Sequence, residues 1–299
     1  MSIFKFFDES RDNSSFNKVS EDNAVVDFKL REGFNRRFQL ETHSTLFALG
    51  NKAIDIRNES VWVIKEIKVI PNGYKLHVEV ESHNVFNNNP SFDGVVKFSK
   101  LFNIPLQELI LNLDLSGNVV QVINQQQVIE VWNAVKTEIL PSLNAEEAQI
   151  IIHNGDSQFG NPIVVLRDTL IYNLFFEPVY GIRKKGEIKV LEKKTFTSQL
   201  FQNVTIPYNP LQKVTEINKN NLHLSYETEV LGFDKEVLVN VYNQIYKDVM
   251  EGGLDYKIGF TGNSIYDMET GLIKNCLIEV RESVNDNLRF ECNYSIKEI

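Results

Sequence analysis

The segment Ile150–Gly160, with the sequence IIIHNGDSQFG, holds the residues best suited to catalysis. Ser157 follows Gly155 and Asp156 at the end of an apolar run. A serine hydroxyl attacks an ester only when a positioned base removes its proton. The histidines that could serve as bases are His43, His77, His83, His153 and His223. Gly155-Asp156-Ser157 is therefore a candidate nucleophile segment for a serine hydrolase.

This segment resembles the nucleophile block of GDS-type esterases. In that family the block follows the first strand near the N-terminus, and a distant Asp-x-x-His supplies the base. Here the block lies in mid-chain, and no histidine is preceded by an aspartate at that spacing. Asn144 and the acids that follow it favour a helix that starts there and stops at Gly155. The helix is the favoured interpretation, and a serine hydrolase stays an alternative.

Histidines and acids also alternate along one predicted strand. They are His77, Glu79, Glu81 and His83. His77 and His83 are six residues apart, which is ~20 Å along a strand, so they cannot share one metal ion. His77 and Glu79 could supply two ligands of one metal ion, but the sequence identifies no further ligands for that ion. A solvated strand face is favoured here and for His223 beside Glu227, so no metal or cofactor is predicted.

Cys276 and Cys292 both fall on apolar faces of predicted strands. Two cysteines are too few for a disulfide framework. Buried structural thiols are favoured over a nucleophile or a redox pair. The strands 271–283 and 287–297 form a predicted hairpin around Asn285-Asp286, which would bring the two thiols near each other.

Composition narrows the function further. The 299 residues carry a formal net charge of −9, with a pI near 5.2, and 42% of them are hydrophobic. The acidity argues against non-specific nucleic-acid binding, which requires clustered Lys and Arg. No signal-peptide core or stretch of ~20 apolar residues is present in the sequence. We expect a cytoplasmic protein, with export by a signal-independent route left open.

Alternating polar and apolar residues dominate the chain and predict antiparallel strands that are wet on one face. In the segment 74–83 the inward residues are Tyr74, Leu76, Val78 and Val80. The preceding Asn72-Gly73 pair is a hairpin signal. The same alternation predicts strands at 222–230 and 288–296.

Three segments have helical spacing instead. The first is the stretch from Asn144 described above. In the helix predicted over 125–140, Val128, Trp132, Val135 and Ile139 share one stripe. Asn124 is its expected cap, and Pro141 prevents its continuation. A further helix is predicted between a cap at Asp234 and a stop at Gly252, with an apolar stripe of Val237, Val241, Ile245 and Val249.

The segment Ile265–Asn275, with the sequence IYDMETGLIKN, is either a functional site or a structural turn. Asp267 and Gly271 are turn residues between two apolar runs. We favour a turn in which Asp267 accepts backbone N–H bonds and Gly271 has a positive φ.

The domain organisation predicted from these elements is simple. Residues 1–20, rich in Ser, Asn, Asp and Phe, form an N-terminal arm. Residues 21–299 form one β-rich domain. Its parts 21–140 and 181–299 are candidate related halves, joined by a helical segment at 141–180.

Three motifs carry a resemblance to a group of uncharacterised Bacteroidetes proteins. They are LDLSGNVVQVINQQQVIEVWNAV, FFEPVYGIRKKGEIKVLE and SIYDMETGLIKNCLIEVRES. The architecture of these proteins is similar to the curved half-barrel of lipoprotein carriers. Members are often exported lipoproteins, whereas this sequence shows neither that signal nor the lipidated cysteine. The resemblance implies no catalytic residues.

We therefore predict an α+β protein whose strongly curved antiparallel sheet is packed with amphipathic helices. The favoured function is a non-catalytic binding protein, such as an immunity or adaptor protein, whose partner is another protein. The alternative is a carrier that holds a lipid or another apolar ligand on the concave face of the sheet.

Overall fold

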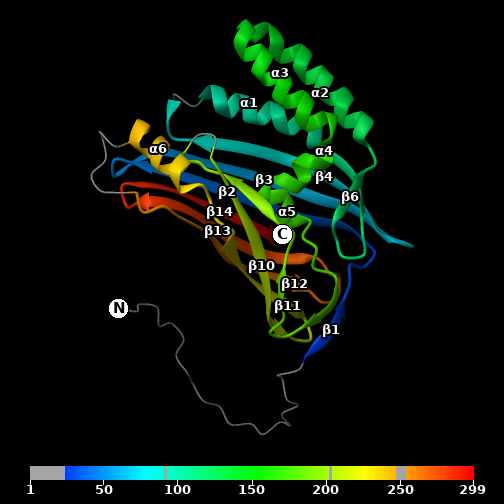
Figure 1. The fold of residues 1–299 in the computed structure, drawn as a ribbon. Coiled ribbons are helices and arrows are strands. Elements are labelled where there is room, and N and C mark those ends of the chain that lie inside the picture. The colour runs from blue at the N-terminus through cyan, green and yellow to red at the C-terminus, as the bar shows by residue number, and fades with distance from the viewer. Residues whose placement is uncertain (1–23, 91–92, 202–203, 247–253) are drawn as a thin grey trace.

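The computed structural model describes residues 24–90, 93–201, 204–246 and 254–299. Most strands join one open sheet in the order β6-β5-β4-β3-β2-β14-β13-β12-β11-β10-β8, and β9 pairs with β10 beside β8 (Figure 1). All pairings are antiparallel. The strands are β1 Val25–Phe28, β2 Gly33–Ala48, β3 Asn51–Ile70, β4 Gly73–Asn87, β5 Glu108–Leu113, β6 Val119–Val122, β7 Gly181–Lys184, β8 Ile188–Val190, β9 Lys194–Thr197, β10 Thr205–Ile217, β11 Asn221–Val230, β12 Lys257–Asp267, β13 Ile273–Asn285 and β14 Leu288–Glu298.

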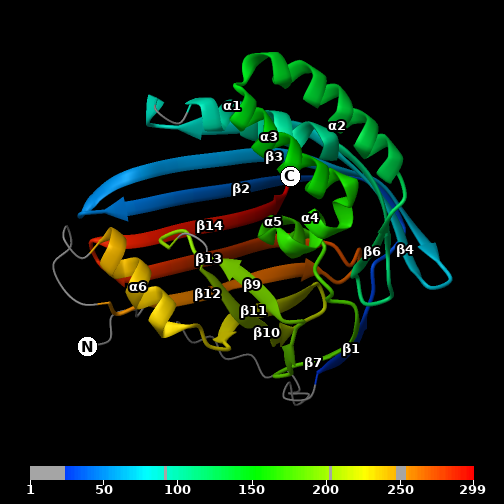
Figure 2. The ribbon, with the colours of Figure 1, turned by 45° about the horizontal axis from the view of Figure 1, so that its top comes forward.

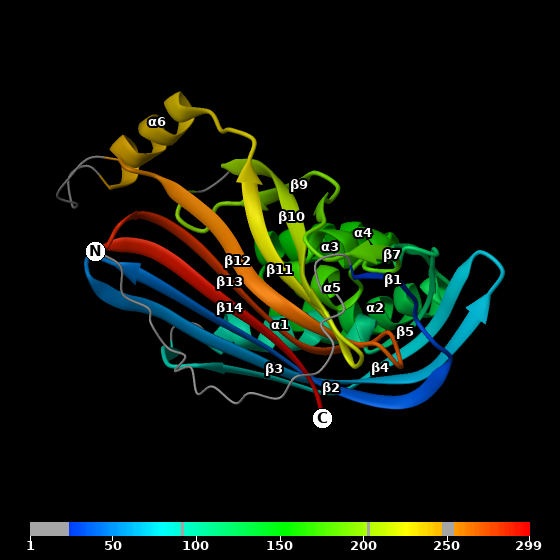
Figure 3. The ribbon, with the colours of Figure 1, turned by 90° about the horizontal axis from the view of Figure 1, so that it is seen from below.

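The sheet is strongly curved and wraps around α2 to α5 when seen from below (Figure 3). Alternation along each strand gives the sheet its two faces. On β13, for example, Ile278 and Val280 are buried on the concave face, whereas Glu279 and Arg281 are exposed on the other. This confirms the predicted α+β class with a curved antiparallel sheet.

The helices lie along the concave side. They are α1 Asp93–Asn103, α2 Gln125–Ile139, α3 Ala145–Gly160, α4 Pro162–Asp168, α5 Leu170–Phe175 and α6 Lys235–Ile245. The predicted stripe of α2 is confirmed, because Val128, Trp132, Val135 and Ile139 are all buried. Asn124 stands at the cap position, but its side chain accepts from Ile110 N and donates to Glu108 O of β5. It therefore ties the helix start to the sheet.

The prediction that a helix stops at Gly155 is wrong. α3 continues to Gly160, and Gly155 is a buried residue inside it. The reason is packing: a Cβ at Gly155 would lie 1.9 Å from a ring carbon of Trp132. Gly155 thus permits close approach of α2 and α3 and does not break the helix.

The predicted stripe of α6 is also wrong in its orientation. Asp234 caps the helix as expected, accepting from Glu236 N and Val237 N. The fully buried residues are Leu238 and Tyr242, while Val237 and Ile245 are exposed. The two stripes are one residue apart, about 100° around the helix, and contacts with the sheet select between them. Val249 and Gly252 lie outside the described residues.

Strands from both parts of the chain meet where β2 pairs with β14, so they form one continuous sheet. β1 and β7 form a separate two-stranded ribbon. The predicted arm, residues 1–20, lies outside the described residues. The proposed duplication of the halves stays a prediction.

Candidate functional site

Ser157 does not form part of a catalytic set in the described structure. It is exposed on α3, and no hydrogen bond joins it to a histidine among the described residues. The neighbouring Asp156 accepts from Trp132 Nε1 at 2.7 Å and from Lys136 Nζ at 2.6 Å. The bond from Lys136, followed by that from Trp132, lowers the pKa of Asp156. Asp156 therefore links α3 to α2.

The histidines of β4 lie on opposite faces of the sheet. The pairing of β4 with β3 shifts between Val61 and Trp62, which are opposite Ser82 and Val80. Such a bulge reverses the alternation beyond it. His77 contacts Glu108 at 3.0 Å, whereas His83 contacts Ser60 at 2.7 Å. The prediction that both histidines share one face is wrong.

The structure also keeps the other candidate metal ligands and the two cysteines apart. No group of three or more potential metal ligands occurs among the residues that the structure describes. Cys276 and Cys292 are buried free thiols, as predicted. Cys292 pairs with Val280, four residues along β13 from Cys276. The two thiols are thus about 13 Å apart along the sheet, and the prediction that they lie near each other is wrong.

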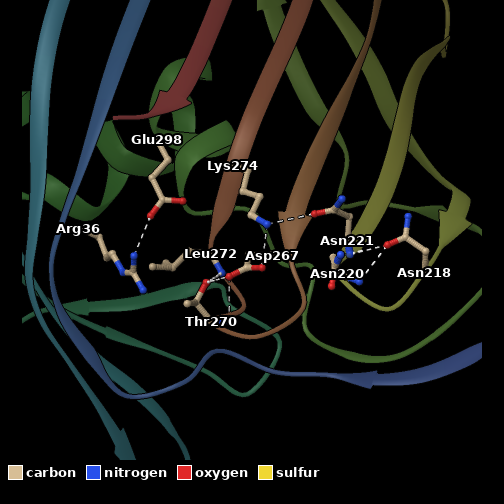
Figure 4. Close-up of polar contacts among 9 residues, drawn as sticks. All are labelled: Arg36, Asn218, Asn220, Asn221, Asp267, Thr270, Leu272, Lys274 and Glu298. Atoms are coloured by element: carbon tan, nitrogen blue, oxygen red, sulfur yellow. Dashed lines mark hydrogen bonds and ion pairs between the residues drawn. The ribbon is translucent and has the colours of Figure 1, made fainter.

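The segment Ile265–Asn275 forms a turn between β12 and β13 with the expected geometry. Asp267 accepts from Thr270 N at 3.3 Å, and Gly271 has a φ of +76°. Lys274 Nζ reaches Asp267 Oδ1 at 2.9 Å and Asn221 Oδ1 at 3.2 Å (Figure 4). Glu269, at the tip, is exposed. The contacts hold this corner to the neighbouring strand.

A buried glutamate, Glu177, lies on the concave side against β10, β11 and β12. Glu177 accepts from Tyr226 Oη, from Tyr266 Oη at 2.8 Å and from Gln212 Nε2 at 2.9 Å. The Arg183 guanidinium in turn donates to Gln212 Oε1 at 2.5 Å. Burial raises the pKa of Glu177. The network fastens the segment between α5 and β7 to three strands.

The space beside Glu177 is too small for a substrate. The cavity measures about 20 Å³ and is lined largely by apolar side chains, including Phe38, Ile64 and Phe176. That volume suffices for about one water molecule. Sequence reasoning missed this network, although a single acid inside the apolar run FFEPV was a usable signal.

A second buried glutamate, Glu282, lies on the concave face of β13. It accepts from Ser198 Oγ, from Gln199 N at 2.8 Å and from Tyr256 Oη at 2.8 Å. Burial raises its pKa as well. Ser198 and Gln199 follow β9, and Tyr256 directly precedes β12, so Glu282 ties these two segments to β13. An acid at an inward position of an alternating strand was its signal in the sequence.

Next to Glu282, on β14, β2 and β3, lies a part of the concave face that we call the central concave patch. In Figure 2 no helix ribbon lies in front of β2, β3 and β14 between α6 and α5. The inward side chains there are half-buried and uncharged. They are Thr42, Ser44, Leu46, Ile54, Ile56, Asn58, Phe290 and Tyr294. Phe290 and Tyr294 continue into the stacked rings of Tyr208 and Phe260, whose centroids are 4.6 Å apart.

The opposite face has a different character. It carries a ladder of cross-strand ion pairs, among them Arg37–Glu81 at 2.5 Å, Lys65–Glu79 at 2.9 Å and Arg57–Glu41 at 3.4 Å. These pairs are at least partly exposed and contribute little stability. The charged side chains are thus concentrated on the convex face, and the central concave patch is left neutral.

No family model matches this chain, and no curated protein is similar to it in sequence. Among solved structures, the chain is similar to a lipovitellin chain from a study of lipid–protein interactions, with a TM-score of 0.47 and 11% identity. The match covers 91% of this chain and 25% of the lipovitellin chain, so this chain spans about a quarter of that length. The resemblance to Bacteroidetes proteins stays a prediction.

Among the described residues, no helix is long and apolar enough to cross a membrane. The cytoplasmic location expected from the sequence also stays a prediction.

Proposed function

We propose that the central concave patch binds an apolar small molecule such as a lipid. The observation that supports this most directly is the neutral, half-buried set of side chains in the middle of the concave face. Small-molecule sites are typically lined by apolar and aromatic residues with a few polar groups, which is the composition found here. Leu46, Ile54, Ile56 and Phe290 supply the apolar surface.

The distribution of packing supports this location. Helices α2 to α5 lie at their end of the curved sheet, where the cavity beside Glu177 measures about 20 Å³. That cavity has no room for a lipid. Covering the half-buried side chains of the central concave patch would stabilise a complex by about 25 cal/mol per Å² of apolar area removed from water.

Binding of a fluorescent hydrophobic probe to the full chain tests this proposal. Ile56→Glu should lower affinity about tenfold or more, because an apolar ligand would leave the introduced carboxylate buried and unpaired. Leu277→Glu is the matched control, since Leu277 is 50% exposed on the opposite face. Equal binding by both variants, or no uptake by the unmodified protein, would contradict the proposal. Native mass spectrometry with solvent extraction would identify a ligand retained from cells.

A second candidate function is the binding of another protein on the convex face. A hollow of about 560 Å³ there is bordered by Phe86 and Leu277, which are 51% and 50% exposed. Its other lining residues include Glu41, His43, Asp55 and Arg57. Apolar anchors within a polar rim are typical of protein interfaces. An immunity or adaptor role belongs to this second proposal.

Variants on the two opposite faces of the sheet distinguish the two candidates. Phe86→Ser and Leu277→Ser should abolish cross-linking of a stoichiometric partner in native cells, and Ile56→Glu should leave it unchanged. Failure to recover any partner from unmodified protein would count against the second candidate alone.

A further inference from the structure

Asn58 is the polar residue in the central concave patch whose contacts are incomplete. It lies on β3 opposite Thr42 of β2 and Val85 of β4. Its Nδ2 donates to Thr42 Oγ1 at 2.9 Å. Its Oδ1 is shielded from solvent and has no hydrogen-bond partner among the described residues. A buried carbonyl oxygen without a donor costs free energy, so a donor that reaches it stabilises the protein.

The charges around the central concave patch are also informative. Its own side chains carry no formal charge. His83, near Asn58 on β4, has a pKa lowered by burial and by Lys100, so it is neutral at pH 7. Lys194 on β9 donates to Arg167 O at 3.0 Å and to Asn173 Oδ1 at 3.2 Å. Lys100 on α1 is solvent-exposed.

One carboxylate, that of Glu282, lies opposite a residue of the central concave patch, and it already accepts hydrogen bonds from other side chains and from the backbone. Glu282 pairs with Phe290 across β13 and β14, and its donors are Ser198, Gln199 and Tyr256. An anionic ligand head group would therefore find no cation among the patch side chains, and a cationic one would find no free carboxylate. Burying an unpaired charge is strongly unfavourable.

We infer that the molecule bound by the central concave patch is an uncharged apolar compound with a hydroxyl or amide N–H that donates to Asn58 Oδ1. This inference rests on the proposed function and names the ligand class of the same site. The class includes long-chain alcohols, whereas fatty-acid anions and phosphate-bearing lipids would meet no cation among the patch side chains. Because Oδ1 is shielded, the donor must be small, and the half-buried side chains beside Asn58 must move slightly to admit it.

Three compounds of equal chain length test the inference by displacement of the hydrophobic probe from the full chain. They are 1-dodecanol, its methyl ether and dodecanoate at pH 8. We expect 1-dodecanol to bind at least tenfold more tightly than the ether, which accepts but does not donate. Dodecanoate should bind more weakly still, because its charge is desolvated without a partner.

Asn58→Leu keeps a similar side-chain volume and removes the acceptor. It should abolish the preference for the alcohol over the ether while probe binding persists. Asn293→Leu is the matched control, because Asn293 is exposed on the opposite face of β14. Circular dichroism of both variants checks that the fold is retained.

The possible outcomes distinguish a failure of the proposed function from a failure of the proposed ligand chemistry. If none of the compounds displaces the probe and the probe itself does not bind, the proposed function fails. If dodecanoate or the ether binds as tightly as the alcohol, the inference about ligand chemistry fails while apolar binding stands. A preference that survives in Asn58→Leu overturns the assignment of Asn58.

Discussion

The indole ring of Trp132 lies directly against Gly155. A Cβ at Gly155 would stand 1.9 Å from one ring carbon and 2.4 Å from the next. Trp132 is 2% exposed, and its Nε1 donates to Asp156 at 2.7 Å. The Gly-Asp-Ser segment that suggested a nucleophile is therefore the surface on which the tryptophan of α2 packs.

We expect Trp132→Ala to lower the free energy of unfolding by ~3–5 kcal/mol, the usual range for emptying a buried aromatic site. Gly155→Ala should also destabilise the protein, because the added methyl group overlaps the ring. Ser157→Ala, on the exposed face of the same helix, is the control. Thermal unfolding measures all three, and a shift of only a degree or two for Trp132→Ala would contradict the packing.

Gly271→Ala should destabilise the protein by more than about 1 kcal/mol. A side chain strains the backbone at a φ of +76°, and a Cβ there would lie 2.2 Å from the carbonyl oxygen of Lys29. Glu269→Gln, at the exposed tip of the same turn, should leave the unfolding free energy unchanged. Chemical denaturation measures both. A larger effect at Glu269 would instead point to a role for this turn beyond its structure.

Glu177→Gln should change how stability depends on pH. Because burial raises the pKa of Glu177 above its ordinary value of 4.5, the folded state binds its proton more tightly than the unfolded state does. This carboxyl therefore makes the free energy of unfolding fall as pH rises from 4.5 through the raised value. In Glu177→Gln, the free energy of unfolding should therefore fall less steeply as pH rises.

The slopes of the variants are compared with that of the unmodified protein, because carboxyls with lowered pKa values make the free energy of unfolding rise with pH. Asp156 and Asp267, for example, have lowered pKa values. Glu282→Gln should reduce the slope in the same sense as Glu177→Gln, since burial raises its pKa too. Denaturant titrations between pH 4 and 8 measure the slopes, and Glu269→Gln serves as control. Unchanged slopes in both buried variants would refute the assignment.

Cys276 and Cys292 should resist thiol reagents in the native protein. Both are buried, and desolvation raises the pKa of each thiol, which suppresses the reactive thiolate. Labelling with iodoacetamide at pH 8 should become complete only in denaturant. Rapid native labelling of either thiol would show that the site opens readily.

The sequence by itself determined the elements whose residues alternate or recur with one period. Alternation predicted β4, β11 and β14, and helical spacing predicted the buried stripe of α2. It also predicted the turn at Gly271, because a positive φ selects glycine locally. These features follow from the chemistry of neighbouring residues along the chain.

The tertiary structure alone decided which faces and partners these elements have. A bulge opposite Val61 and Trp62 separates His77 from His83, and contacts with the sheet turn Leu238, not Val237, toward the core. Glu177 meets Tyr226 and Tyr266, which are 49 and 89 residues further along the chain. No local period encodes such contacts, because they form only when the curved sheet brings distant strands around one buried carboxylate.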